Sequence, residues 1–129
     1  MTNLRDEGLN VFREMLPGVL PDDLPNEKVS FGKGFANELM EIGIEGIFGR
    51  LWSREGLARR DRSLLTLGIL IALGAEDELE SHFRIAKQNG LTDEELAEVV
   101  YHSSGYAGFP AANTAKAAAL RAFMPDHDL

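Results

Sequence analysis

Glu78 and His82 are the residues of this sequence whose types and spacing most directly suggest chemistry. They stand four positions apart, so in a helix their side chains would meet on one face. A carboxylate beside an imidazole forms either a buried structural hydrogen bond or an acid–base pair tuned for proton transfer. The spacing alone favours the structural interpretation, because a buried histidine usually has a satisfied partner. Both interpretations stay open at this point.

Arginines gather in the middle of the chain, where they could bind an anion. A guanidinium group can hold a carboxylate through two parallel hydrogen bonds. The alternative is a solvated rim of surface ion pairs, in which Asp61 pairs with a neighbour. Six of the nine arginines fall in this third of the sequence: Arg50, Arg54, Arg59, Arg60, Arg62 and Arg84.

A second pair with helical spacing is His102 and Tyr106, although a tyrosine near a turn is usually a packing residue. Glu78, His82 and His102 could together form a His/carboxylate metal site, but no His-x₃-His spacing supports one. The sequence contains no cysteine, which excludes disulfides, thiolate metal sites and a catalytic cysteine. It also has no P-loop and no nucleophile-elbow motif.

Composition and charge indicate which kinds of partner and which cellular location to expect. The chain has 129 residues and a formal net charge of −8, which disfavours binding to nucleic acid. The first nine residues lack the apolar segment of a signal peptide. The longest apolar stretch, residues 64–73, is far shorter than the roughly 20 residues of a membrane span. We therefore expect a cytoplasmic protein without a membrane or nucleic-acid partner.

The elements that position the candidate residues are predicted to be helices throughout, because no stretch alternates with period two. Three prolines within residues 17–25 predict a loop, and the glycines of 43–56 predict an irregular connection. The fold class is therefore all-α, with about six helices in one domain. After a first helical stripe from Leu4 to Leu16, helices are expected at 31–44, 57–73 (mostly buried), 76–89, 92–105 and 111–123.

Local signals mark several helix ends. Gly74 and Gly90 are expected to terminate two helices in left-handed conformation. Thr92 and Glu95 have the spacing of a capping box, and Pro110 suits the first turn of the last helix. His127, in the tail 125–129, has no evident role.

Several motifs together resemble the carboxymuconolactone decarboxylase family. The resemblance extends over about residues 31–123 and leaves 1–30 as a divergent N-terminal helix and Pro-rich loop. It implies a single domain over 1–129 with an alkyl hydroperoxidase D-like all-α fold, assembled as trimers or hexamers. The motifs are Leu51-Trp-Ser-Arg-Glu-Gly-Leu57, Arg62-Ser-Leu-Leu-Thr-Leu67, Ala72-Leu-Gly74, Glu78-Leu79, His82, Asn89-Gly-Leu-Thr92, Glu94-Glu95 and Tyr106-Ala-Gly-Phe-Pro-Ala-Ala-Asn113.

The resemblance also separates two branches of this superfamily. The alkyl hydroperoxidase D branch carries Cys-x-x-Cys-x-x-x-His, whose cysteines would fall at Ala75 and Glu78. Their absence removes dithiol peroxidase chemistry. The decarboxylase branch has Glu and His at the positions of Glu78 and His82, and this raises the odds of a functional pair.

The activity implied by that branch is decarboxylation, without a cofactor, of a small carboxylated lactone or related enolisable acid in aromatic-compound catabolism. Such a reaction needs a group that stabilises the developing dienolate and a proton donor for carbon. The resemblance implies His82 in these roles and Glu78 as its orienter. It implies Arg59 or Arg62 as the clamp for a second carboxylate. The remaining expected substrate contacts are Tyr106, His102 and Trp52.

The sequence departs from the family pattern mainly on its N-terminal side, where Phe48-Gly49 and Glu55 replace common family residues. We therefore expect an altered N-terminal part of the pocket.

Two alternatives stay open: an oligomeric binding protein without catalysis, and a metal-dependent enzyme. Five aromatic residues could be buried either between subunits or in the chain's own core: Phe31, Phe35, Phe48, Trp52 and Phe109.

Overall fold

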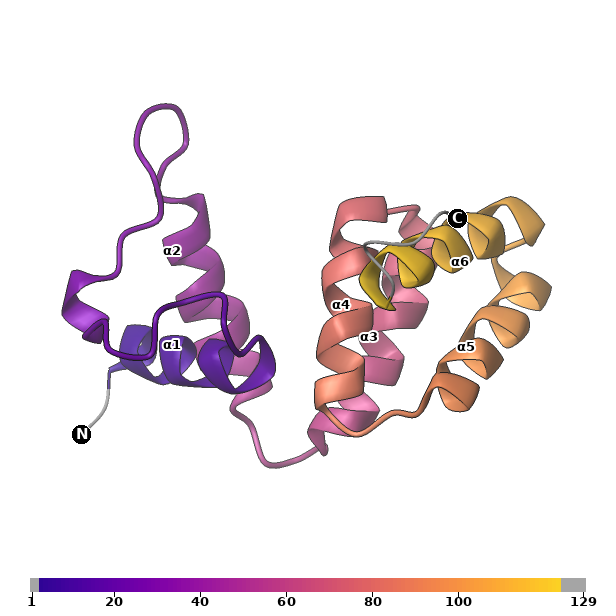
Figure 1. The fold of residues 1–129 in the computed structure, drawn as a ribbon, viewed down its shortest axis with the longest axis horizontal. Helices are drawn as coiled ribbons and strands as arrows, with labels where there is room; N and C mark the ends of the chain where they lie inside the picture. Colours follow the sequence, from indigo (N-terminus) through magenta and orange to yellow (C-terminus); the bar gives the residue numbers. More distant parts are fainter. Residues whose placement is uncertain (1–2, 124–129) are drawn as a thin grey trace. The chain divides into compact units, whose positions relative to one another are not determined.

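Every regular element that the computed structural model shows within residues 3–123 is a helix, which confirms the all-α class (Figure 1). The structure describes these residues, so His127 lies outside the described part. The contacts divide the chain into an N-terminal unit, residues 1–57, and a C-terminal unit, residues 58–129. The single family domain over 1–129 stays a prediction.

The N-terminal unit is built around two crossing helical segments. Helix α1 spans Leu4–Met15 and is capped by Asn3, whose side chain accepts a hydrogen bond from the amide of Asp6 at 2.7 Å. The second segment comprises α2, Leu39–Gly43, and the π-helix η2, Ile44–Trp52. A short 3₁₀ helix, η1, covers Asn26–Lys28. The buried cluster between these elements consists of Leu9, Phe12, Val29 and Ile44.

Two glycines allow the backbones of α1 and η2 to touch. A Cβ atom added to Gly8 would collide with the carbonyl oxygen of Ile44, and one added to Gly49 would collide with that of Leu4. Any larger residue at either position must push the helices apart, because packed interiors leave no space for an extra methyl group.

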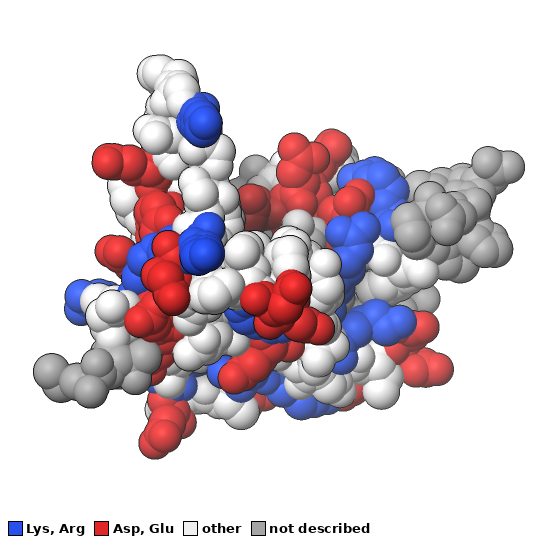
Figure 2. All heavy atoms as spheres, turned by 60° about the vertical axis from the view of Figure 1, so that its left-hand side comes forward, with Lys and Arg blue, Asp and Glu red and all other residues white. Residues whose placement is uncertain are grey.

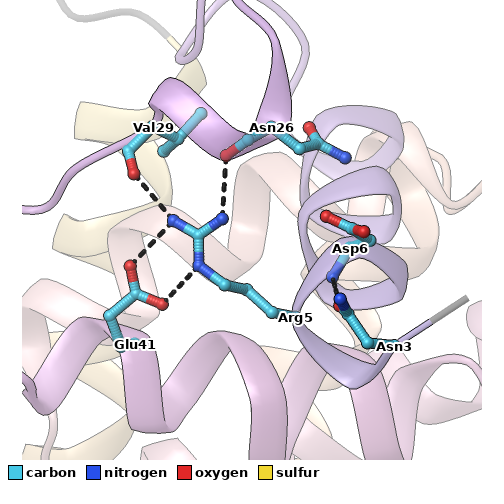
Figure 3. Close-up of polar contacts among 6 residues, drawn as sticks. All are labelled: Asn3, Arg5, Asp6, Asn26, Val29 and Glu41. Carbon is cyan, nitrogen blue, oxygen red and sulfur yellow. Dashed lines mark hydrogen bonds and ion pairs between the residues drawn. The ribbon is translucent and has the colours of Figure 1, made fainter.

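Arg5 fastens the loop between α1 and α2 (Figure 3). Its guanidinium group donates to both carboxylate oxygens of Glu41, at 2.7 and 2.9 Å, in the two-pronged geometry that arginine favours. It also donates to the backbone carbonyls of Asn26 and Val29, at 2.8 and 2.7 Å. The hydrogen bond from Arg5 lowers the pKa of Glu41, so this carboxylate stays ionised in mildly acidic solution.

The helix expected at 31–44 and the irregular connection expected at 43–56 are both wrong in their boundaries. The chain becomes helical only at Leu39 and stays helical through Trp52. Phe35, which lies within the helix expected at 31–44, is fully exposed and precedes the first helical residue. Three positive φ angles in the preceding segment, at Gly32, Gly34 and Ala36, explain the late start, because a right-handed helix cannot include left-handed residues.

In its described part, residues 58–123, the C-terminal unit contains four helices around one core. Helices α3, Arg59–Leu73, and α4, Glu76–Gln88, form an antiparallel hairpin joined at Gly74 and Ala75 (Figure 1). Helices α5, Asp93–Tyr106, and α6, Phe109–Phe123, complete the unit. The core comprises Leu67, Ile71, Leu79, Phe83, Ala86, Leu91, Leu96, Ala115, Ala118 and Ala119.

The helix-capping signals expected in this unit are confirmed. Gly74 adopts the left-handed conformation with φ of 68°, and Gly90 has φ of 102°. Thr92 and Glu95 form both hydrogen bonds of the capping box, at 3.1 and 3.0 Å. Pro110 is the second residue of α6, whose alanines face the core.

Helix α3 is more exposed than the sequence suggests. It begins at Arg59 rather than at Leu57, and the expectation of a mostly buried helix is wrong for one of its faces. Leu65, Ile69 and Leu73, spaced by four, are 59%, 51% and 74% exposed. A continuous apolar run in the sequence therefore covers two faces, only one of which meets the core. No helix among the described residues is long and apolar enough to cross a membrane.

The five aromatic residues near the predicted connections fall into two groups, those that pack in the N-terminal unit and those that are exposed. Trp52 is buried, and Phe31 and Phe48 pack against the buried cluster of the N-terminal unit. Phe48 lies edge-on to Phe12 with 5.3 Å between ring centroids. Phe35 and Phe109 are exposed, so only these two agree with the expectation of aromatic residues outside the chain's own core.

Candidate active site

Helix α4 places Glu78 and His82 side by side. The Nε2 atom of His82 lies 4.0 Å from Oε2 of Glu78. The imidazole is only 12% exposed, whereas the carboxylate is 69% exposed. The pair thus joins a buried ring to a charged group in water, an arrangement in which a proton can pass between solvent and a drier place.

Burial controls the charge of His82. Loss of hydration lowers the pKa of this imidazole, and the negative charge of Glu78 only partly opposes that effect. His82 is therefore neutral at neutral pH. A neutral imidazole can donate one N–H hydrogen bond and accept one proton, so to act as the proton donor expected from the sequence it must first take up a proton.

The arginines expected to bind the substrate lie at the start of α3. Arg59 and Arg62 belong to its first turn, and both are partly buried. One turn further on, the Oγ atom of Ser63 accepts a hydrogen bond from Nδ2 of Asn89 at 2.9 Å. This bond ties the first turn of α3 to the C-terminal end of α4, the helix that carries Glu78 and His82.

His102 and Tyr106 line a different region, between α3 and α5. Two adjoining cavities of about 530 and 310 Å³ share Gly68, His102 and Ser103 as lining residues. The rings of His102 and Tyr106 are tilted against each other, with centroids 5.1 Å apart. Glu78 and His82 line neither cavity. The structure thus brings together each pair expected from spacing, but it does not bring the two pairs into one cavity.

The charges of the larger cavity do not suit an anionic ligand. Arg60 is its one arginine, and it forms an ion pair with Glu95. Glu98 also lines the cavity and contributes a further negative charge. A substrate with two carboxylates would meet repulsion from these glutamates.

Trp52 belongs to the N-terminal unit, where it is 5% exposed, and its expected contact with substrate stays a prediction. Among residues 3–123, no group of three histidine, aspartate or glutamate side chains lies close enough to hold a metal ion, so no ligand set supports the metal-dependent alternative. On the face drawn in Figure 2, basic side chains lie among acidic ones.

Three further residues of this region were not predicted from the sequence to have a role: Ser63, Asn89 and Glu98. A serine next to the apolar stretch of a predicted helix is a sequence signal that could have identified Ser63. Asn89 directly precedes a helix-ending glycine and looks like part of the turn. Glu98 is one of several glutamates on α5, and nothing in the sequence indicates that it lines a cavity.

The chain is similar to three known proteins over half or more of its length. It is 50% identical over 85 residues to the 4-carboxymuconolactone decarboxylase of Acinetobacter baylyi, covering 66% of this chain and 60% of that protein. It is 37% identical over 107 residues to the nitrosuccinic acid decarboxylase of Metarhizium robertsii, covering 83% and 72% of the two chains. An uncharacterised 15.0 kDa protein of Paracoccus denitrificans is 39% identical over 70 residues, 53% of this chain and 52% of that one.

A family model also matches the chain directly. The match covers residues 38–121, which include α2, η2 and the described C-terminal unit almost to its end. Glu78, His82, Arg59 and Arg62 all lie inside it. The chain therefore belongs to the carboxymuconolactone decarboxylase family.

Proposed function

We propose that this protein is a cofactor-independent decarboxylase of a small carboxylated lactone or a related enolisable acid, acting in aromatic-compound catabolism. The observation that carries the proposal is the buried, neutral His82 beside the exposed Glu78 within the matched family region. The relatives from Acinetobacter and Metarhizium, which bear the names of decarboxylases, support the reaction class. The chain spans about 60% of the length of the Acinetobacter relative.

The proposed reaction breaks the bond between a carboxylate and a saturated carbon that is joined to a carbonyl group through a carbon–carbon double bond. The electron pair of that bond moves onto the carbonyl oxygen and leaves a dienolate as carbon dioxide departs. The N–H group of neutral His82 stabilises the developing negative charge by donating a hydrogen bond. The dienolate carbon then takes a proton, which enters from water on the side of the exposed Glu78 and passes through His82.

A second carboxylate of the substrate would bind Arg59 or Arg62. Both arginines lie on the helix that packs against α4. His102 and Tyr106 line that other cavity, and Trp52 belongs to the N-terminal unit. Their contacts with the substrate remain proposals that single substitutions can test.

The proposed assembly is a homo-oligomer, a trimer or hexamer. Its support in the structure is the exposed face of α3 formed by Leu65, Ile69 and Leu73. Three large aliphatic side chains in a row at one-turn spacing form a patch of the kind that soluble proteins usually cover. A small anionic organic molecule and further copies of the chain are thus the proposed partners.

Carbon dioxide release tests the proposed function. Metal-stripped protein is incubated separately with γ-carboxymuconolactone and with nitrosuccinate, and both carbon dioxide and the remaining substrate are measured. Catalytic release from either compound supports decarboxylation and identifies the better substrate. Thermal stabilisation by a compound without any product would instead favour a binding protein, and activity that returns only with added metal would favour the metal-dependent alternative.

A further inference from the structure

Ser63 is a polar residue in a place that otherwise excludes polar residues. Among the described residues it is the one polar side chain in the buried class, at 1% exposure. Serine is a poorer helix former than alanine or leucine, and burying a hydroxyl group is unfavourable unless it is hydrogen-bonded. Its partner is the side-chain amide of Asn89, 2.9 Å away.

The backbone of Asn89 does not require an asparagine. Asn89 ends α4 with φ of −83°, a value open to almost any residue, whereas the left-handed position belongs to Gly90. Asparagine is also a poorer helix former than most residues. The amide side chain therefore explains the residue at this position through what it contacts, which is Ser63.

This hydrogen bond lies on the face of α4 that carries the proposed active site. Glu78, His82, Ile85 and Asn89 follow the spacing of four, three and four that defines one face of a helix. On the other helix, Ser63 directly follows Arg62 and lies one turn after Arg59. The bond thus joins the segment that carries the two arginines to the face that carries the acid–base pair.

The position of the bond fixes a separation between these groups. Asn89, the residue that caps α4, lies seven positions after His82, which corresponds to about 10 Å along the helix axis. Because α3 and α4 are antiparallel, sliding one helix along the other would change the separation between Arg62 and His82. Interdigitated apolar side chains oppose such sliding, and a hydrogen bond between two defined atoms adds a directional constraint on the register.

We propose that the Ser63–Asn89 hydrogen bond sets the register of α3 on α4 and so fixes the separation between the arginine clamp and the Glu78–His82 pair. Ser63 and Asn89 are then positioning residues, which act through Arg59, Arg62 and His82 without touching the substrate. This role rests on the proposed function, since it assigns a purpose to the separation between the two groups.

The variants Ser63→Ala and Asn89→Ala, alone and combined, test the role. The control is Arg121→Gln, which removes a contact of comparable length, 2.9 Å from Nε of Arg121 to Oε1 of Glu80, between α6 and α4. We expect kcat/KM for carbon dioxide release to fall about 10- to 100-fold in each single variant. The double variant should lose little more, because both changes break the same bond. The control should stay within about two-fold.

A second measurement does not depend on the substrate. The ring ¹H–¹³C signals of His82, assigned by their loss in His82→Gln, should shift in Ser63→Ala and Asn89→Ala but not in Arg121→Gln. If the wild-type protein releases no carbon dioxide from either compound, the proposed function fails, and these signals alone decide whether the bond positions His82.

A purely structural bond would give a different pattern. Both single variants would then melt at lower temperature, yet kcat/KM well below the melting temperature and the His82 signals would match the wild type. That result would overturn the proposed role. If Ser63→Ala does not fold, Asn89→Ala, at a helix end, supports the same comparison.

Discussion

The Nε2 atom of His82 and the Oε2 atom of Glu78 lie 4.0 Å apart, although one side chain is almost buried and the other is mostly in water. Two opposed effects therefore act on the pKa of His82. Burial lowers the pKa of the imidazole, and the carboxylate raises it. The balance keeps His82 neutral but holds a negative charge close by, which stabilises the imidazolium form whenever a proton arrives.

Removing the charge of Glu78 should slow the proposed reaction. In Glu78→Gln, the pKa of His82 should fall further because the opposing charge is lost, and we expect kcat to fall about 10- to 100-fold. Steady-state kinetics and a histidine NMR titration measure both effects.

Glu80→Gln is the matched control for that variant. Glu80 lies on the same helix, but it pairs with Arg84 and Arg121. Because it is two positions from Glu78, its side chain points to a different face of the helix. Its kcat should stay within about two-fold of the wild type. Equal losses in the two variants would show that charge on α4 matters only in general.

The lowered pKa of His82 predicts how stability depends on pH. In the unfolded chain this histidine takes up a proton near its ordinary pKa, about 6.5, whereas the folded protein resists protonation until the pH is lower. Stability contributed by neutral His82 is therefore present above the ordinary pKa and is lost as the pH falls from there to the folded pKa. The melting temperature should drop between pH 7 and pH 5, and this drop should be smaller in His82→Gln than in the wild type. An equal drop in the two proteins would contradict the effect of burial on the pKa of His82.

The contact between α1 and η2 should not tolerate a methyl group at Gly8. In Gly8→Ala the new Cβ meets the carbonyl oxygen of Ile44, and we expect the free energy of unfolding to fall by about 3 kcal/mol. Gly46→Ala is the control within η2, because a Cβ there meets nothing within 4 Å. It should be neutral or up to about 1 kcal/mol more stable. Urea unfolding compares the two variants, and equal behaviour would mean that the helices can separate without loss.

The exposed apolar face of α3 should be covered by another copy of the chain when the protein self-associates. Replacing Ile69 with lysine puts a charge in the middle of the patch, and we expect sedimentation equilibrium to show smaller particles than the wild type. Glu76→Lys, which changes a charge at an already polar position on α4, serves as the control. A wild-type protein that is monomeric at micromolar concentration would contradict the proposed assembly.

Much of the C-terminal unit could be predicted from the sequence because its signals are local. The glycines at 74 and 90 and the capping box at Thr92 and Glu95 each specify a helix end within a few residues. The pairing of Glu78 with His82 follows from helix geometry alone. These features depend on neighbours in the sequence, so reading along the chain recovers them.

The remaining features depend on contacts between distant segments. The glycines of η2 suggested an irregular connection, but Gly49 serves helix packing against Leu4, which the sequence places 45 positions away. Likewise, the exposure of Leu65 cannot be distinguished from burial when both faces of α3 are apolar. The bond between Ser63 and Asn89 joins residues 26 positions apart, and a pattern along one helix does not reveal it.

The most direct test of the central claim is kcat for carbon dioxide release by His82→Gln, measured with whichever of the two compounds the wild-type protein decarboxylates. Glutamine keeps an N–H donor but cannot take up and pass on a proton at neutral pH. Because His82 is proposed to carry the proton to the dienolate carbon, kcat should fall about 10²- to 10⁴-fold in a variant whose circular dichroism matches the wild type. A folded variant with kcat within about two-fold of the wild type would contradict the account.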